Sequence, residues 1–305
     1  MKIKYKNFIQ DNFQILEKEK QVPVPFYFNK VQNKYYDILS QIYPEFEGVR
    51  EIVLKARQEG ISSFVLALFA TDFLLRPYSI SICISHRKDS TDILFKKVKS
   101  YLDSYFQILA KKNKLHPEII AKQFLKSDNR NMLENATNNA MFYIGTAGAK
   151  VGGRGGTAKN ILFSETAFYA DTELITAQEI VVGTAQQVPQ GKGMIFIEST
   201  ANGEGNFYQK TWEQANQFGT DGKRLSVYRP QFFGWDEFYT KEWVEEKKKD
   251  FPNEMMWKQE YPQDPDEAFV TSGSPYFNVM KLKDMLKTRP TPLRQGKFAM
   301  DGQWA

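Results

Sequence analysis

Short apolar runs rich in β-branched residues alternate with segments of helical periodicity, and this order constrains the fold more than any other feature of the chain. A mostly apolar helix is expected at 62–75, and apolar and charged residues recur at helical spacing at 90–109. Parallel strands need long crossover connections, which are usually helices. The order therefore predicts an α/β fold, with a mainly parallel sheet flanked by helices. The expected strands are at 51–56, 78–85, 139–148, 160–165, 193–200 and 224–230.

The composition narrows the class of protein. With 305 residues, 42% of them hydrophobic, the chain is long enough for one large domain or a domain with a subdomain. A net charge of +5 is only weak support for a polyanionic partner. The single Cys83 and the two histidines exclude an intrachain disulfide and a His-rich metal site. The most apolar run, 61–75, contains Asp72 and is too short to span a bilayer, so we expect an intracellular protein with no membrane partner.

The stretch VLKARQEGISS resembles a phosphate-binding loop with its lysine out of place. In the pattern G-x-x-x-x-G-K-[ST], Gly60 and Ser62 match, Ile61 stands at the lysine position, and Lys55 stands at the first glycine. Such a loop curls back on itself between a strand and a helix N-terminus, so a lysine at its front can still reach the phosphates. Arg57 adds a second cation. The alternative interpretation is an ordinary strand-to-helix turn capped by serine.

Two later strands also end in polar motifs. NILFSETAFY ends in Glu165, where a general base stands in this kind of sheet, and Ser164 replaces the acid expected to hold Mg²⁺. ESTANGEG places Ser199, Thr200 and Asn202 at the end of another strand, where small polar groups can sense a γ-phosphate. Taken singly, the first is also explained by a helix-capping carboxylate and the second by a turn. Three such strand ends in order favour a nucleotide site.

In this order the motifs resemble the ATPase domain of the large terminase subunit of tailed bacteriophages, a DNA-packaging motor. KARQEGISS is similar to the family's deviant Walker A motif, ILFSETAFY to its Walker B variant, and IESTANGEGNFY to its coupling motif. PFYFNKVQNKYYDIL resembles the adenine-recognition segment, with Gln32 as the amide that would read the base. EYPQDPDEAFVTSG resembles the signature beyond the ATPase core. The resemblance extends along nearly the whole chain.

The resemblance implies a P-loop NTPase fold of the additional-strand (ASCE) type with ATP and Mg²⁺ as cofactors. It places the ATPase core at 1–230, a small C-terminal lid subdomain at 231–290, and a linker at 291–305. Ser62 and Ser164 are expected at the metal, which would be held through water because serine is no carboxylate. The residues expected at the nucleotide are Gln32, Lys55, Ala56, Arg57, Gln58, Glu59, Gly60, Ile61, Ser62, Ser63, Ser199, Thr200 and Asn202.

Glu165 is the expected catalytic base, and two arginines compete for the role of arginine finger. Arg154, in the glycine-rich segment KVGGRGGTAKN, is expected to reach the γ-phosphate on a neighbouring subunit. Arg57 is the rival, acting within its own subunit. The alternative for Arg154 is an incidental arginine in a glycine-rich surface loop.

The resemblance also implies the partners: double-stranded DNA, the portal protein of the procapsid and the small terminase subunit, in the host cell cytoplasm. It implies a homo-oligomeric ring when assembled, with a monomer as the alternative for the isolated chain. The sequence ends where the family's nuclease domain would begin, so we expect a motor domain without a nuclease. Two other functions remain open, a helicase-like translocase and a nucleotide-binding scaffold without turnover.

Overall fold

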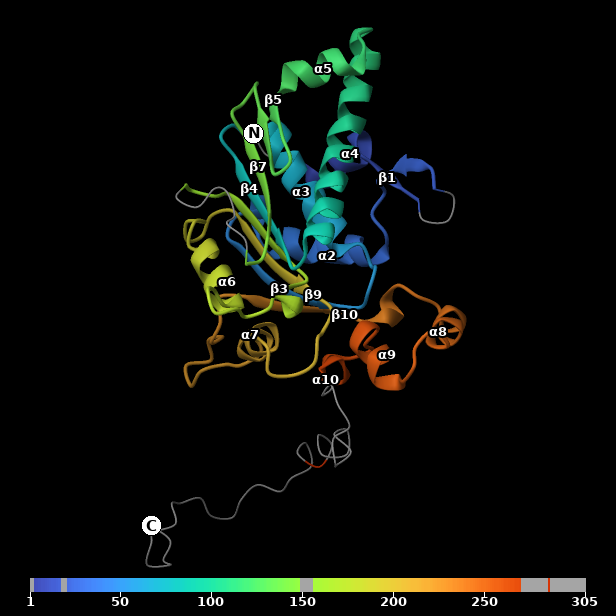
Figure 1. The fold of residues 1–305 in the computed structure, drawn as a ribbon, viewed down its shortest axis with the longest axis vertical. Helices are drawn as coiled ribbons and strands as arrows, with labels where there is room; N and C mark the ends of the chain where they lie inside the picture. Colours follow the sequence, from blue (N-terminus) through green and yellow to red (C-terminus); the bar gives the residue numbers. More distant parts are fainter. Residues whose placement is uncertain (1–2, 18–20, 149–155, 270–284, 286–305) are drawn as a thin grey trace, which may run out of the picture.

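The computed structural model describes residues 3–17, 21–148, 156–269 and 285, and its centre is a sheet of eight strands in the order β10-β3-β9-β8-β4-β7-β6-β5 (Figure 1). Strands β10 to β7 are parallel, and β6 and β5 extend the sheet as antiparallel strands. The prediction of a mainly parallel sheet is confirmed. The strands are β3 (Val49–Lys55), β4 (Ile80–Ser85), β5 (Leu125–Asp128), β6 (Met132–Asn135), β7 (Met141–Thr146), β8 (Asn160–Ser164), β9 (Met194–Ser199) and β10 (Arg229–Phe233), with a separate hairpin of β1 (Gln14–Leu16) and β2 (Pro23–Pro25).

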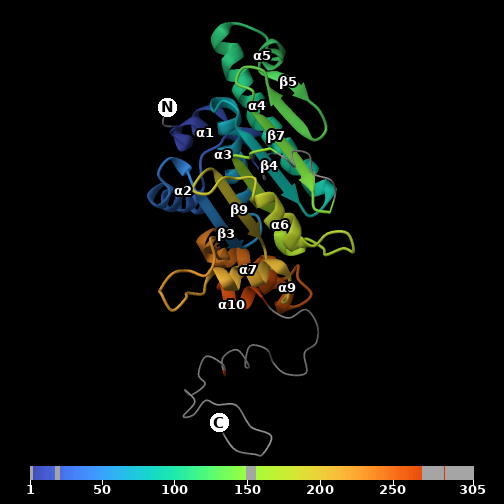
Figure 2. The same cartoon turned by 90° about the vertical axis from the view of Figure 1, so that its left-hand side faces the viewer.

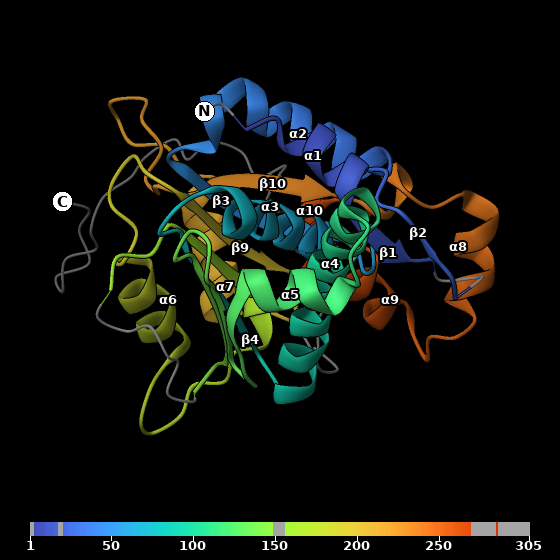
Figure 3. The same ribbon diagram turned by 90° about the horizontal axis from the view of Figure 1, so that it is seen from above.

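Helices cover both faces of the sheet, as Figures 2 and 3 show. Helices α1 to α5 contribute to the apolar cluster on one face, and α6 and α7 contribute to the cluster on the other. The helices are α1 (Tyr5–Asn12), α2 (Lys30–Ile42), α3 (Ile61–Leu75), α4 (Lys88–Asn113), α5 (Pro117–Phe124), α6 (Ala177–Ala185), α7 (Phe207–Ala215), α8 (Lys241–Lys248), α9 (Glu254–Glu260) and α10 (Pro265–Ala268), with 3-10 turns η1 (Pro44–Phe46), η2 (Thr166–Phe168) and η3 (Trp235–Glu237).

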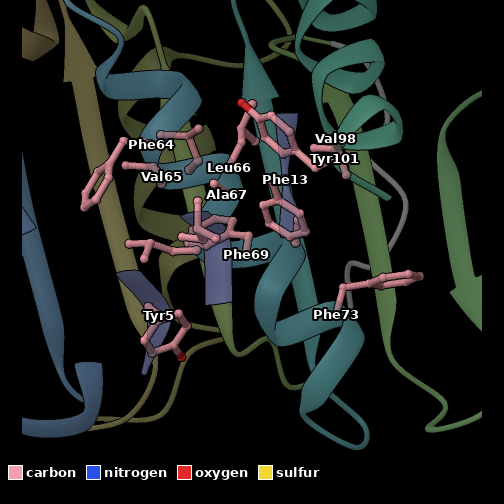
Figure 4. Packing of buried hydrophobic residues seen from close by; sticks show 14 of the residues in the cluster. Tyr5, Phe13, Phe64, Val65, Leu66, Ala67, Phe69, Phe73, Val98 and Tyr101 are labelled. Carbon is pink, nitrogen blue, oxygen red and sulfur yellow. The ribbon is translucent and has the colours of Figure 1, made fainter. Parts of the chain in front are cut away.

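The sequences of the central strands are nearly continuous apolar runs because both faces of these strands are buried. On β3, Val53 packs into the α3-side cluster, whereas Ile52 and Leu54 pack into the cluster on the opposite face. Figure 4 shows the α3-side cluster, in which Phe64 and Phe69 lie against the sheet. Helix α3 is buried along almost its whole length, which explains why the sequence there is apolar on all sides. None of the helices in the described part of the chain is both long and apolar enough to cross a membrane.

Strand β9 lies between β3 and β8, so the strand that ends at Glu165 is not the direct neighbour of the strand that carries the loop. This is the arrangement of the additional-strand class, and it brings the ends of β3, β9 and β8 side by side at one edge of the sheet. The predicted alternation of strands and helices therefore produces the expected fold.

One predicted strand is misplaced. The segment 224–230 was expected to be a strand, but β10 begins at Arg229, and Leu225 and Val227 are 52% and 78% exposed. Their apolar alternation belongs to a surface loop. Strand β10 is also the edge of the sheet, which is why it tolerates Pro230, a residue without an N–H group to donate. Strand β10 crosses residue 230, where the sequence analysis placed the boundary between the ATPase core and the lid subdomain.

The lid expected at 231–290 includes the helices α8, α9 and α10, which lie together at one end of the sheet (Figure 1). Their small apolar cluster contains Val244, Trp257 and Tyr261 and includes Ala56 of the loop after β3. Residues 270–284 and the predicted linker at 291–305 lie outside the described residues.

Candidate nucleotide site

Three polar side chains, those of Lys55, Ser164 and Glu198, lie on the same face of the sheet near the ends of β3, β8 and β9. Val53 on β3 and Ser164 on β8 are both register partners of Glu198 on β9. Side chains alternate along a strand, so Lys55 points to the same face as Val53, and Glu198 and Ser164 point there too. This is the face that α3 covers. Lys55, Glu198 and the predicted metal residue Ser164 therefore lie close together near the beginning of α3.

The loop between β3 and α3 has the backbone of a phosphate-binding turn. Gly60 precedes the first residue of α3 and has a φ of 83°, a left-handed conformation that suits glycine. A Cβ atom added there would lie 2.6 Å from Nε2 of Gln32, so a side chain at this position would also have to displace the Gln32 amide. The N–H groups of the first turn of α3 face the loop, and a helix N-terminus of this kind can hold an anion.

Lys55 is the central cation of the site. Its Nζ lies 2.9 Å from Oε1 of Glu165 and 3.0 Å from Oε2 of Glu198, and the residue is 4% exposed. Burial alone would lower the pKa of Lys55, but the attraction of the two carboxylates outweighs it and raises the pKa. Lys55 therefore stays charged, and the structure places it in the site, as the displaced-lysine hypothesis requires.

Glu165 follows β8 at the start of η2 and has a φ of 53°, which is uncommon for a residue with a side chain. Its Oε1 accepts a hydrogen bond from Lys55, and its Oε2 accepts one from the N–H of Thr200 at 3.2 Å. Burial alone would raise the pKa of Glu165, but Lys55 outweighs it and holds the pKa below its usual value. The carboxylate is thus ionised and fixed in a strained turn, which is typical of a functional site.

Glu198 is the residue that the sequence analysis missed. It lies within the apolar run of β9 and is fully buried. Its Oε1 accepts hydrogen bonds from the hydroxyl groups of Ser62 at 2.8 Å and Ser164 at 2.6 Å. The available signal was an acid inside an otherwise apolar strand, one residue before the polar motif that the analysis assigned to phosphate sensing. Ser62 and Ser164 therefore lie together at one oxygen of Glu198, and their role at a metal stays a prediction.

The residues of the coupling motif surround Glu165. The hydroxyl of Ser199 accepts a hydrogen bond from the N–H of Ala167 at 3.2 Å and lies 3.4 Å from Oε2 of Glu165. Nδ2 of Asn202 donates to the carbonyl of Ala167 at 3.1 Å. In this structure both side chains fix the turn that carries Glu165.

Arg57 contacts the lid. Its Nη1 lies 2.8 Å from Oε2 of Glu260, its N–H donates to the carbonyl of Glu260 at 2.9 Å, and its own carbonyl accepts a hydrogen bond from the hydroxyl of Tyr239 at 2.8 Å. Burial lowers the pKa of Arg57, but Glu260 outweighs this and raises it. Ala56 is buried against the lid, whereas Gln58 is exposed at a φ of 66°. The rival arginine, Arg154, lies outside the described residues.

Gln32 and Ser63 lie beside the loop and are engaged with other elements. Nε2 of Gln32 donates to the carbonyl of Gly60 at 2.8 Å, and its Oε1 caps α2 by accepting from the N–H of Asn29 at 3.0 Å. The hydroxyl of Ser63 accepts a hydrogen bond from Nζ of Lys97 on α4 at 2.9 Å. Ile61, at the usual lysine position, is buried in the core. Gln32 therefore supports the loop directly, and base recognition by its amide stays a prediction.

The strand order and the loop–helix junction give the chain the fold of a P-loop NTPase of the additional-strand class. More narrowly, it has the fold of the ATPase domain of phage large terminases. The large terminase ATPase domain of Thermus phage P74-26 superposes with a TM-score of 0.51 at 16% identity, covering 76% of this chain and 97% of that one. The large terminase of bacteriophage HK97 superposes with a TM-score of 0.61 at 11% identity, covering 92% of this chain and 57% of that one. No protein-family profile and no curated protein matches the sequence.

Glu59 is a buried acid in the loop itself. It is 0% exposed, and in the described part of the chain neither of its carboxyl oxygens has a hydrogen-bond partner. Burial raises the pKa of Glu59 to about 9; Lys55 opposes this rise, and Glu237 and Asp236 of the lid region add to it. At neutral pH the group is therefore a neutral carboxylic acid inside the loop.

This protonation predicts a pH-dependent stability. The folded chain binds the Glu59 proton more tightly than the unfolded chain, so wild type should lose stability relative to Glu59→Gln as pH rises from about 4.5 to about 9. The expected slope is roughly 1 kcal/mol per pH unit. Urea unfolding of both chains at pH 5.5 and pH 8.5 measures it. Glu245→Gln, at an exposed position on α8, controls for the lost charge. Parallel stability curves for wild type and Glu59→Gln would contradict this interpretation.

Proposed function

We propose that this chain is the ATP-hydrolysing motor domain of a viral large terminase subunit, which drives double-stranded DNA into a procapsid. The observation that carries the proposal is the ion pair between Lys55 and Glu165, 2.9 Å long, where the loop and the ends of β8 and β9 meet. It places a phosphate-binding cation beside a carboxylate that can activate water. The fold shared with large terminase ATPase domains supports the motor function.

In this proposal the ATP phosphates lie over the loop at the N-terminus of α3, where backbone N–H groups and Lys55 can neutralise them. Ser62 and Ser164 offer oxygen atoms at the same place, and oxygen ligands are those that Mg²⁺ prefers. Mg²⁺, when bound, would neutralise charge that develops on the phosphate oxygens. The residues present therefore fit both cofactors.

Glu165 then acts as the base that orients and deprotonates the attacking water. Burial alone would raise the pKa of Glu165, but Lys55 outweighs it and lowers the pKa, which makes Glu165 a weak base while the two are paired. Phosphates compete with Glu165 for the ammonium group of Lys55. Nucleotide binding would therefore weaken the ion pair and raise the pKa of Glu165 towards a value better suited to proton abstraction.

Motor action needs partners, and we propose double-stranded DNA, the portal protein and the small terminase subunit, acting in the host cell cytoplasm. A homo-oligomeric ring would let Arg154 of one subunit complete the ATP site of the next. Arg57 is less suited to that role, because its guanidinium group and backbone are bound to the lid residues Glu260 and Tyr239.

The function is tested by measuring ATP hydrolysis by the chain alone, with linear double-stranded DNA, and with DNA plus procapsids that carry portals. A terminase motor should hydrolyse ATP faster with DNA and procapsids, and DNA should become protected from added nuclease. Stimulation by single-stranded DNA without any effect of procapsids would instead favour a helicase-like translocase. ATP binding without turnover under all of these conditions would favour the nucleotide-binding scaffold, and an absence of ATP binding would overturn the proposed function.

Lys55→Ala should weaken ATP binding by about tenfold to a hundredfold. Its ammonium group is the buried cation of the site, and a hydrogen bond to a charged group contributes roughly 1.5–3 kcal/mol. Fluorescence titration with an ATP analogue measures the affinity. Lys96→Ala, which removes an exposed lysine from α4, is the matched control. Equal affinities in the two variants would show that Lys55 does not contact phosphate.

Glu165→Gln should separate binding from hydrolysis. The amide has nearly the same shape as the carboxylate but cannot accept the proton of water. We expect ATP affinity to be retained while turnover falls on the order of a hundredfold or more. Steady-state phosphate release and ATP titration measure the two quantities on the same preparation. Turnover close to that of wild type would place the base elsewhere.

A further inference from the structure

Strand β8 ends in a serine where a metal-binding acid is expected, and its neighbour β9 carries an acid at the matching position. Ser164 and Glu198 are direct partners in the parallel β8–β9 ladder. Partners in a parallel ladder point to the same face of the sheet. An acid on β9 can therefore reach the space that a carboxylate on β8 would fill, because glutamate is one methylene group longer than aspartate.

The hydrogen bonds show that Glu198 does reach this space. One oxygen, Oε1, accepts from Ser164 at 2.6 Å and from Ser62, at the start of α3, at 2.8 Å. Both hydroxyl groups donate their hydrogen atoms to Glu198. The lone pairs of each hydroxyl oxygen are therefore available to a cation. The other oxygen, Oε2, lies 3.0 Å from Nζ of Lys55 but makes no aligned hydrogen bond in the described part of the chain. The cluster thus combines a carboxylate with two oriented hydroxyl oxygens.

The balance of charge also indicates a cation. Lys55 contributes one positive charge, whereas Glu165 and Glu198 contribute two negative charges. Glu198 is fully buried, so water does not compensate it. A triphosphate would be repelled by this excess unless a divalent cation came with it. Mg²⁺, which is commonly bound by one or two carboxylates together with substrate phosphates, matches both the charge and the oxygen ligands.

We propose that Glu198 supplies the carboxylate of the Mg²⁺ site, so that the acid missing from the end of β8 is provided by the adjacent strand. This inference rests on the proposed ATPase function. It assigns Glu198 a role distinct from that of Glu165: Glu198 holds the metal with Ser62 and Ser164, and Glu165 activates water. The competing explanation is that Glu198 is only a structural counter-ion of Lys55.

A metal-binding measurement distinguishes these explanations without relying on turnover. Mn²⁺ serves as the probe, because its electron paramagnetic resonance signal reports the fraction bound to the protein with a non-hydrolysable ATP analogue. Glu198→Gln should weaken Mn²⁺ binding by about 10- to 100-fold. Glu51→Gln is the matched control, because it also removes a fully buried carboxylate with a cationic partner, Arg229, but lies outside the site, so its Mn²⁺ affinity should stay close to that of wild type.

A second variant tests whether a carboxylate on β8 can replace the one on β9. In the double variant Ser164→Asp, Glu198→Gln, the carboxylate returns to the end of β8, and Mn²⁺ affinity should recover most of the loss. This variant also decides the question if Glu198→Gln alone fails to fold. A counter-ion of Lys55 would behave differently: nucleotide affinity in EDTA would change as much as Mn²⁺ affinity, and Ser164→Asp would restore neither.

Three results would overturn the inference. They are wild-type Mn²⁺ affinity in folded Glu198→Gln, a folded double variant without recovered Mn²⁺ binding, and failure of both variants to fold, which would make Glu198 a structural group. A wild-type chain that binds no ATP analogue, with or without Mn²⁺, would instead overturn the proposed ATPase function. Wild-type binding of nucleotide together with an unaffected Glu198→Gln would overturn only the metal assignment.

Discussion

A single buried ammonium group connects the parts of the candidate site. Lys55, at the end of β3, pairs with one carboxylate that follows β8 and another on β9. Burying these charges costs free energy unless they are paired, so each of the three strands needs the other two to complete the arrangement. The predicted base and the predicted phosphate-binding lysine therefore cannot be positioned independently of each other.

This arrangement depends on the register of the sheet. Ser164 and Glu198 meet only because the β8–β9 ladder pairs them, and a shift of one residue would turn Glu198 to the opposite, apolar face. The same alternation gives each central strand two apolar faces and fixes its register from both sides. The polar residues of the candidate site lie near the carboxyl ends of the strands, where α3 begins. The extensive core thus sets the positions of a few charged atoms.

The sequence predicted the features that follow from local order. Strands alternating with helices imply a parallel sheet, and the carboxyl ends of its strands meet at one edge, so Lys55 and Glu165 could be expected to lie together. Glu198 could not be assigned in this way, because its role depends on which residue of β8 it faces. The attachment of Arg57 to Glu260 depends on a contact across most of the chain. The prediction of a strand at 224–230 was wrong because Leu225 and Val227 are exposed, whereas the apolar residues of β3 are buried on both faces.

The attachment of the loop to the lid has a mechanical consequence. The backbone N–H and carbonyl of Arg57 are bound by Glu260 at the end of α9 and by Tyr239, and Ala56 is packed into the lid's aromatic cluster. These hydrogen bonds and the packing of Ala56 couple the loop to the end of α9, so a displacement of one favours a displacement of the other. In the proposed ATPase, a change in the shape of the loop on binding a triphosphate would therefore be transmitted to α9 and to the aromatic residues packed around Ala56.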